Sequence, residues 1–181
     1  MKKIKTYRMP ISRLFPATHP RAGEETKFKE KIETALSCDE CKHVSPDTCD
    51  VCNSKIIFKC HTIRANYELW KKRIDEVNAG EAVLVLFEWT EKPYRSKTRE
   101  ILKFDKDSGI GVQKLEFEYL DLGCSRIELE TDNPKLQGMV HYPLETLSGN
   151  DGLSVTDFRA WFKGYDLSKT LGIIQFTKFR Y

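Results

Sequence analysis

Two pairs of cysteines constrain the fold of this chain more than any other feature of its sequence. They are spaced Cys38-x2-Cys41 and Cys49-x2-Cys52. Two intervening residues allow both thiolates of a pair to turn toward one point, and four sulfur ligands in tetrahedral geometry are typical of structural Zn²⁺ sites. A site with four protein ligands leaves no open position for a substrate. The sequence therefore predicts one structural zinc ion that fixes residues 38–53 as a small inserted module.

The rest of the chain has the composition of a globular domain. Its 181 residues are 40% hydrophobic and 11% aromatic, which suffices for a core. No segment has the roughly 18 consecutive apolar residues of a membrane span, and the basic start Met1–Lys5 is not followed by the apolar stretch of a signal peptide. We therefore expect a single domain over residues 1–181, without a membrane partner, in the reducing cytoplasm. In that compartment, paired cysteines bind metals more often than they form disulfides.

Charge is unevenly distributed, although the formal net charge is only +3. Residues 38–53 carry four acidic side chains against one lysine, whereas basic side chains gather in residues 1–37, 55–73 and 92–99. The acidic insertion argues against direct contact with nucleic acid there, and it favours either a protein partner or simple bracing. The basic segments fit two interpretations equally well, a solvated surface or a folded basic patch.

Hydrophobic periodicity predicts helices and short strands that do not alternate strictly. Helices are expected over residues 24–36 and 66–79, and from the capping box that begins at Ser154. Strands are expected over residues 56–63, 82–89, 98–104, 112–119, 126–130, 138–142 and 171–179. Such a set favours an α+β fold around a small curled sheet.

The part of the chain that follows the cysteines resembles the ASCH family, whose fold is a PUA-like β-barrel. The matching features, in chain order, are Lys59-x-x-Thr62-Ile63-Arg64, a helix, Gly80, a hydrophobic strand at Ala82–Phe87, the turn Asn150–Leu153, and a final helix and strand at Thr156–Phe162 and Ile173–Phe179. The resemblance covers roughly residues 56–181, apart from 103–133. It implies a small PUA-like mixed β-barrel with two or three flanking helices and the zinc knuckle as an insertion.

The resemblance also implies a site at the mouth of the barrel. Small ASCH enzymes that remove the acyl group from acylated cytidine are similar in having a lysine and a threonine three residues apart and an acidic residue before the last helix. The corresponding residues here are Lys59, Thr62 and Asp151, where Asp151 replaces a glutamate. In such chemistry Thr62 attacks an amide carbonyl, Lys59 takes its proton if burial lowers the lysine pKa, and Asp151 protonates the leaving amine or orients the lysine.

Strand geometry sets a condition on this site. Residues three apart on a regular strand point to opposite faces, so Lys59 and Thr62 converge only if the strand bends or ends near His61.

Basic and aromatic residues add a prediction of nucleic-acid binding. Cationic side chains can hold phosphates, and the rings of Trp89 and Tyr94 can stack on bases. The candidate residues are Lys59, Arg64, Trp89, Tyr94, Arg95, Lys97 and Arg99. The sequence thus predicts that the pocket around Lys59 binds RNA or a modified nucleotide. Two alternatives stay open: an amidohydrolase that acts on an acylated nucleobase, and a protein-interaction module that uses the acidic zinc insertion.

Overall fold

The computed structural model describes residues 4–37, 58–117, 125–128 and 138–181 of the chain. The inserted module lies outside the described residues, and so do its predicted zinc ligands, which are Cys38, Cys41, Cys49 and Cys52.

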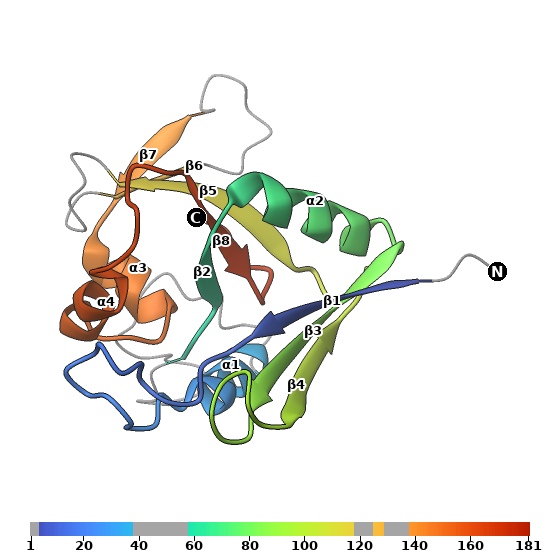
Figure 1. The fold of residues 1–181 in the computed structure, drawn as a ribbon. Coiled ribbons are helices and arrows are strands. Elements are labelled where there is room, and N and C mark those ends of the chain that lie inside the picture. The colour runs from blue at the N-terminus through green and yellow to red at the C-terminus, as the bar shows by residue number, and fades with distance from the viewer. Residues whose placement is uncertain (1–3, 38–57, 118–124, 129–137) are drawn as a thin grey trace.

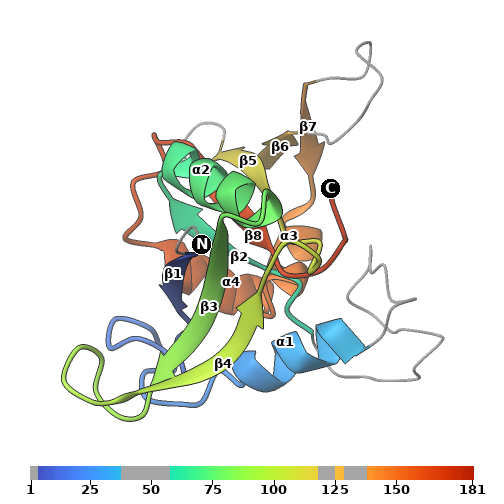
Figure 2. The ribbon, with the colours of Figure 1, turned by 90° about the vertical axis from the view of Figure 1, so that its right-hand side faces the viewer.

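The N-terminal strand belongs to a three-stranded sheet. Its strands, in spatial order, are β1 (Lys5–Pro10), β3 (Ala82–Trp89) and β4 (Thr98–Phe104). Strand β1 runs parallel to β3, and β3 and β4 form an antiparallel hairpin. The register of the hairpin shifts between Leu86 and Phe87. Figure 2 shows the loop that joins β3 to β4 at the edge of the molecule.

A second sheet contains five strands, all paired antiparallel. Their spatial order is β2 (His61–Ala65), β8 (Leu171–Gln175), β5 (Gly111–Phe117), β6 (Ser125–Glu128) and β7 (Met139–Tyr142). Strand β8 lies between β2 and β5, and all five of its residues are buried. Strand β2, which carries Thr62 and Arg64, is an edge strand of this sheet.

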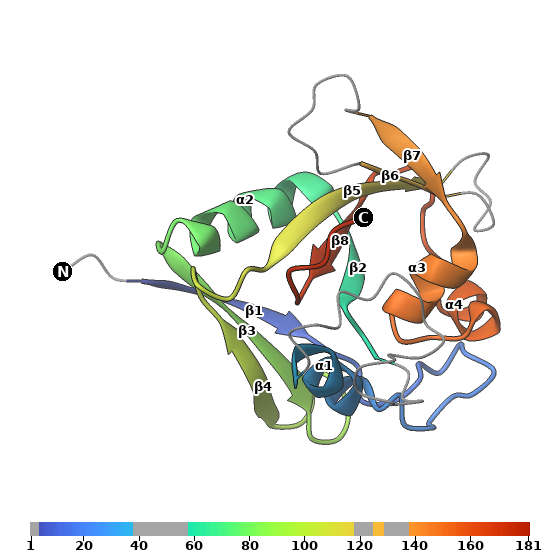
Figure 3. The same ribbon diagram turned by 180° about the vertical axis from the view of Figure 1, so that it is seen from behind.

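Helices cover the two sheets from different sides. The helices are α1 (Phe28–Ser37), α2 (Tyr67–Asn78), α3 (Leu144–Asn150) and α4 (Val155–Phe162). Helix α2 contacts β3, β5 and β8, so it packs on both sheets. In the three ribbon views (Figures 1, 2 and 3) α2 lies in the upper half of the molecule and α1 in the lower half. Helices α3 and α4 lie together on the side away from the N-terminus (Figures 1 and 3).

Helix α2 shows how the sequence specifies an element. Trp70, Ile74 and Val77 fall on one stripe and are buried. The side chain of Asn66 accepts a hydrogen bond from the N–H of Leu69 and caps the first turn. Gly80 follows the last turn with a φ of +74°, a conformation that suits glycine. Both sheets and all the helices contribute to one buried hydrophobic cluster.

The prediction of an α+β fold is confirmed, but its finer features differ. Within the described residues, neither sheet closes into a barrel, and there are four helices rather than two or three. Strand β1 and helix α3 were not predicted from the sequence. The last strand ends at Gln175 instead of reaching Phe179. None of the described helices is both long enough and apolar enough to cross a membrane.

Candidate functional site

Lys59 and Asp151 form a buried ion pair between two elements of the fold. Lys59 lies just before β2, and Asp151 follows the last residue of α3. The Nζ of Lys59 lies 2.5 Å from Oδ1 of Asp151 and donates a second hydrogen bond of 2.7 Å to the backbone oxygen of the same residue. The two side chains are only 2% and 5% exposed. A charged pair is thus held away from solvent with a matched partner.

The backbone around Gly152 allows this close approach. Its φ is +75°, a region that residues with a Cβ rarely adopt. A Cβ at this position would lie 3.1 Å from Cβ of Lys59 and 3.4 Å from the carbonyl oxygen of Phe58. The N–H of Cys60 also donates a 2.8 Å hydrogen bond to the carbonyl of Asn150. The Asp151–Gly152 turn is therefore packed directly against the chain that carries Lys59.

One small cavity brings together the pocket residues predicted from the sequence. Lys59, Thr62, Arg64 and Asp151 all line it. Its volume is about 10 Å³, which is room for about one water molecule. Phe28 and Trp161 are among the residues that form its walls, together with Ile11, Ser12, Ile63 and Phe162.

The start of strand β2 explains how Lys59 and Thr62 can face the same cavity. It begins at His61, so Lys59 precedes the strand and does not follow its alternation. Thr62 and Arg64 are two residues apart and therefore share a face, and both line the cavity. Arg64 also donates a 2.5 Å hydrogen bond from Nη2 to the carbonyl of Pro10 at the end of β1. Arg64 thus connects the two sheets beside the cavity.

Burial is the main influence on the ionisation of the pair. It lowers the pKa of Lys59 and raises the pKa of Asp151, and the attraction between the two charges opposes both shifts. Both shifts bring the charged pair closer in free energy to its neutral form, so a proton can pass between Lys59 and Asp151 more easily than between exposed side chains. A general base must take up a proton near neutral pH, so the pair is suited to move one.

Polar side chains lie buried behind the pair. The Nδ2 of Asn150 donates a 3.0 Å hydrogen bond to the hydroxyl of Tyr181. The rings of Tyr181 and His61 pack in a T shape, with their centroids 5.7 Å apart. Among the described residues, neither ring nitrogen of His61 has a hydrogen-bond partner. Burial lowers the pKa of His61 well below its usual value, so the imidazole is neutral. His61 therefore adds no charge near Asp151, and the cations that act on this carboxyl are Lys59, Arg64 and Lys31.

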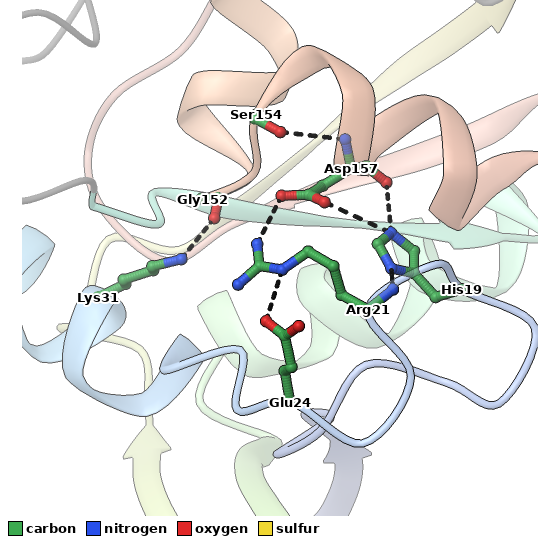
Figure 4. Close-up of polar contacts among 7 residues, drawn as sticks. All are labelled: His19, Arg21, Glu24, Lys31, Gly152, Ser154 and Asp157. Carbon is green, nitrogen blue, oxygen red and sulfur yellow. Dashed lines mark hydrogen bonds and ion pairs between the residues drawn. The ribbon is translucent and has the colours of Figure 1, made fainter.

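A loop from the N-terminal region is fastened to α4 near the cavity (Figure 4). The Nε2 of His19 lies 3.1 Å from the carbonyl oxygen of Asp157, and its Nδ1 accepts a hydrogen bond from the N–H of Arg21. The guanidinium of Arg21 donates to the carboxylate of Asp157 at 2.9 Å. His19 also lies edge-on to Trp161, with ring centroids 6.2 Å apart. These contacts hold Trp161, and with it one wall of the cavity, in place.

The predicted nucleic-acid residues of the β3–β4 hairpin do not line this cavity. Trp89 ends β3, and its ring lies 5.3 Å from that of Tyr94, which is 86% exposed and has a φ of +62°. Arg95 and Lys97 are exposed on the same loop. Arg99 instead bonds the buried carboxylate of Glu88. The structure therefore separates Arg64 from the hairpin residues with which the sequence grouped it.

A second cavity lies between the hairpin and α1. It is open and has a volume of about 270 Å³. Charged side chains line it from the hairpin (Glu88 and Arg99), from α1 (Lys29 and Glu30) and from the N-terminal loop (Arg13). Phe28 lines this cavity and the Lys59 cavity alike. The ring of Phe28 therefore separates an open polar groove from the buried pair.

Sequence reasoning missed three residues of the site. Phe28 and Trp161 are not among the residues predicted for the site, yet both form walls of the cavity. Lys31 was not singled out, yet its Nζ donates a 2.8 Å hydrogen bond to the carbonyl of Gly152. A lysine on a helix face carries no signal for such a contact, because the partner lies 121 residues further along the chain.

The described residues contain no group of three or more histidine, cysteine or acidic side chains placed to hold a metal ion. Cys60 is buried, and burial raises the pKa of its thiol to about 12, which makes it a poor nucleophile.

No family model, curated protein or solved structure matches the chain. Function must therefore be inferred from the geometry of the site.

Proposed function

We propose that this chain binds RNA or a modified nucleotide, and that one base of the ligand enters the cavity of Lys59, Thr62, Arg64 and Asp151. The observation that carries the proposal is the buried Lys59–Asp151 pair on the wall of that cavity. A buried ion pair adds little stability compared with apolar residues of the same volume, because desolvation offsets the attraction. Ionisable groups with strongly shifted pKa values beside a cavity are characteristic of functional sites.

Both the polar edge of a base and its faces would find partners here. The carbonyl and amino groups of a base can pair with the carboxylate of Asp151, the ammonium of Lys59 and the guanidinium of Arg64, while Phe28 and Trp161 provide ring faces. A cavity with room for about one water molecule must widen to admit a base. The proposal therefore requires that Phe28 or Trp161 move when the ligand binds.

The β3–β4 hairpin would contact other parts of a longer ligand. Tyr94 and Trp89 offer aromatic surface for stacking, and Arg95 and Lys97 carry exposed charges suited to phosphates. Arg99 is expected to contribute less, because its guanidinium already pairs with Glu88.

Binding to single-stranded RNA over a range of salt concentrations tests this proposal. Neutralised phosphates release counterions, so the affinity should fall steeply as salt rises. Arg64→Ala should weaken binding strongly, whereas Lys106→Ala, which removes the same charge at the far end of β4, should not. An affinity that does not change with salt, or equal effects of the two variants, would remove the RNA-binding proposal.

The direct contact between Lys59 and Asp151 favours a second candidate function, hydrolysis of an acylated nucleobase. In this reaction the hydroxyl oxygen of Thr62 attacks the amide carbonyl while the amine of Lys59 takes the hydroxyl proton. The C–N bond then breaks, a proton from the pair passes to the leaving nitrogen, and water hydrolyses the acyl ester on Thr62. The scheme needs a lysine whose pKa is lowered, and burial lowers the pKa of Lys59.

A panel of acylated nucleosides with product detection by mass spectrometry tests the second function. Turnover should disappear in Lys59→Met and Thr62→Ala, and Thr62→Ser should keep part of it because the hydroxyl remains. Asp151→Glu should be tolerated, since the similar family uses glutamate at this place. Unchanged turnover in Lys59→Met would remove the role of the lysine as base.

The relation to the ASCH family and its PUA-like barrel also remains a proposal. Its support is the order of β2, α2, Gly80 and β3, which follows the order of the family's features. The Lys59–Asp151 contact adds to this support, since the resemblance assigns both residues to one site.

The zinc site is proposed on the chemistry of its donors. Four thiolates from Cys38, Cys41, Cys49 and Cys52 suit a closed, structural Zn²⁺. Elemental analysis of the purified protein should give one zinc per chain, and Cys41→Ser should lower that content. If residues 38–53 instead form the binding surface for a protein partner, capture of that partner should require them.

A further inference from the structure

Lys31 on α1 is hydrogen-bonded to both halves of the candidate site. Its Nζ donates a 2.8 Å hydrogen bond to the carbonyl of Gly152, which directly follows Asp151 (Figure 4). Its backbone carbonyl accepts a 3.1 Å hydrogen bond from the N–H of Lys59. One residue thus connects the chain segment that carries the lysine of the pair with the turn that carries the carboxylate.

Packing supports the same connection. A Cβ added to Gly152 would lie 3.3 Å from Cδ of Lys31 and 3.1 Å from Cβ of Lys59, so the aliphatic part of Lys31 closes over the turn. The ammonium groups of the two lysines lie over the same ring, that of Phe28, at 4.3 Å for Lys59 and 5.6 Å for Lys31. Lys31 therefore belongs to the shell of contacts that surrounds the pair.

Charge links the three ionisable groups. Burial and, next in size, the nearby charge of Lys59 lower the pKa of Lys31 to about 8. Asp157 and Asp151 oppose that shift, and Arg21 reinforces it. In turn, the charge of Lys31 helps to lower the pKa of Asp151. The side chains that face Lys31 from α4, from the N-terminal loop and from the segment before β2 thus all act on it.

We propose that Lys31 is a positioning residue of this site, which holds the Asp151–Gly152 turn against Lys59. Its effect on ligand binding rests on the proposed function, whereas its effect on the pair does not. Loss of the Lys31 ammonium should free the carbonyl of Gly152 and let the turn move away from Lys59.

The test compares three variants by NMR titration of the Asp151 carboxyl carbon in the full chain. Lys31→Met keeps the aliphatic stem and removes the charge and the donor, so the midpoint of Asp151 should move to higher pH. Lys31→Arg keeps a cation and should restore a midpoint close to that of the wild type. Lys163→Met, at the exposed end of α4, removes a lysine elsewhere and should leave the midpoint unchanged. An unchanged midpoint in Lys31→Met would overturn the proposal.

A second measurement applies even if Lys31→Met fails to fold. The side-chain nitrogen of Lys31 can be titrated by NMR in the wild type, where the midpoint should lie near 8, and in Lys59→Met, where it should rise because the neighbouring charge is gone. Equal midpoints in the two proteins would mean that the lysines are not coupled, which would also overturn the proposal.

RNA binding by the same variants separates the two proposals. If Lys31→Met shifts Asp151 and weakens RNA binding while Lys163→Met does neither, the positioning role and the proposed function are both supported. If the wild type binds no RNA but the Asp151 shift appears, only the proposed function fails.

Discussion

The Lys59 cavity and the β3–β4 hairpin place similar side chains in opposite environments. In the cavity, a lysine and an aspartate are almost fully buried and paired with each other. On the hairpin, Arg95 and Lys97 are exposed and Tyr94 presents most of its ring to solvent. Burial shifts pKa values and makes each group depend on its partner, whereas exposed charges are screened by salt. The cavity can thus provide chemistry and selectivity, and the hairpin can provide general attraction to a polyanion.

The largest expected effect comes from breaking the buried pair. Asp151→Ala leaves the ammonium of Lys59 buried without its counter-charge, which should lower the free energy of unfolding by about 3–5 kcal/mol. Denaturant unfolding measures this loss. The double variant Lys59→Met/Asp151→Leu removes both charges and should recover most of the stability. If Asp151→Ala were as stable as the wild type, the pair would not be buried in solution as it is in the structure.

The next effect concerns the turn that supports the pair. Gly152→Ala forces a Cβ into a left-handed backbone conformation against Lys59, and it should cost about 1–3 kcal/mol of unfolding free energy. Gly164→Ala is a matched control, because no atom lies within 4 Å of its added Cβ and its φ is not positive. Thermal unfolding of both variants checks the difference. Equal stabilities would show that the turn does not pack tightly on the site.

A smaller, pH-dependent effect is expected from Lys31. Its pKa is near 8 in the folded chain and near 10.5 when unfolded, so between these values the unfolded chain binds more protons. The contribution of Lys31 to stability should therefore increase as pH rises from about 8 to 10.5 and be constant below that window. The difference in unfolding free energy between wild type and Lys31→Met, measured at several pH values, should show this rise. A difference that falls with pH would contradict the assigned direction.

The hairpin should show the smallest effect on stability and a clear effect on binding. Arg95→Ala changes an exposed side chain, so the free energy of unfolding should change by no more than about 0.5 kcal/mol. If Arg95 contacts a phosphate, RNA affinity should fall and the slope of log affinity against log salt should decrease by about 1. Lys106→Ala provides the control for nonspecific charge. Unchanged affinity in Arg95→Ala would remove Arg95 from the proposed binding surface.

Several elements could be predicted from local sequence because their signals are local. The bounds of β3 and β4 agree with the predicted strands, and α2 agrees to within one residue at each end. Ser154 caps α4 as its spacing to Asp157 predicted, with a hydrogen bond from the N–H of Asp157. Apolar runs, stripes and caps act over a few residues and do not depend on the rest of the fold.

Other elements depend on distant partners and gave no such signal. Strand β1 contains Lys5, Arg8 and Pro10 and is mostly exposed, so only its pairing with β3 defines it. Helix α3 contains Ser148, Gly149 and Asn150, which are weak helix formers, and its burial among neighbouring elements stabilises it. The missing closure of the predicted barrel likewise concerns which strands pair, and strand pairing is a long-range property.

The sequence by itself determined that polar side chains stand at Lys59, Thr62, Arg64 and Asp151, and the resemblance to a family grouped them. Only the tertiary structure decided that Lys59 and Asp151, 92 residues apart, share a hydrogen bond out of contact with water. It also placed Lys31 beside them and Arg99 on Glu88. The physical reason is that the strength of a charge interaction depends on solvent exclusion. Solvent exclusion is produced by the packing of the whole chain and is not encoded in any short segment.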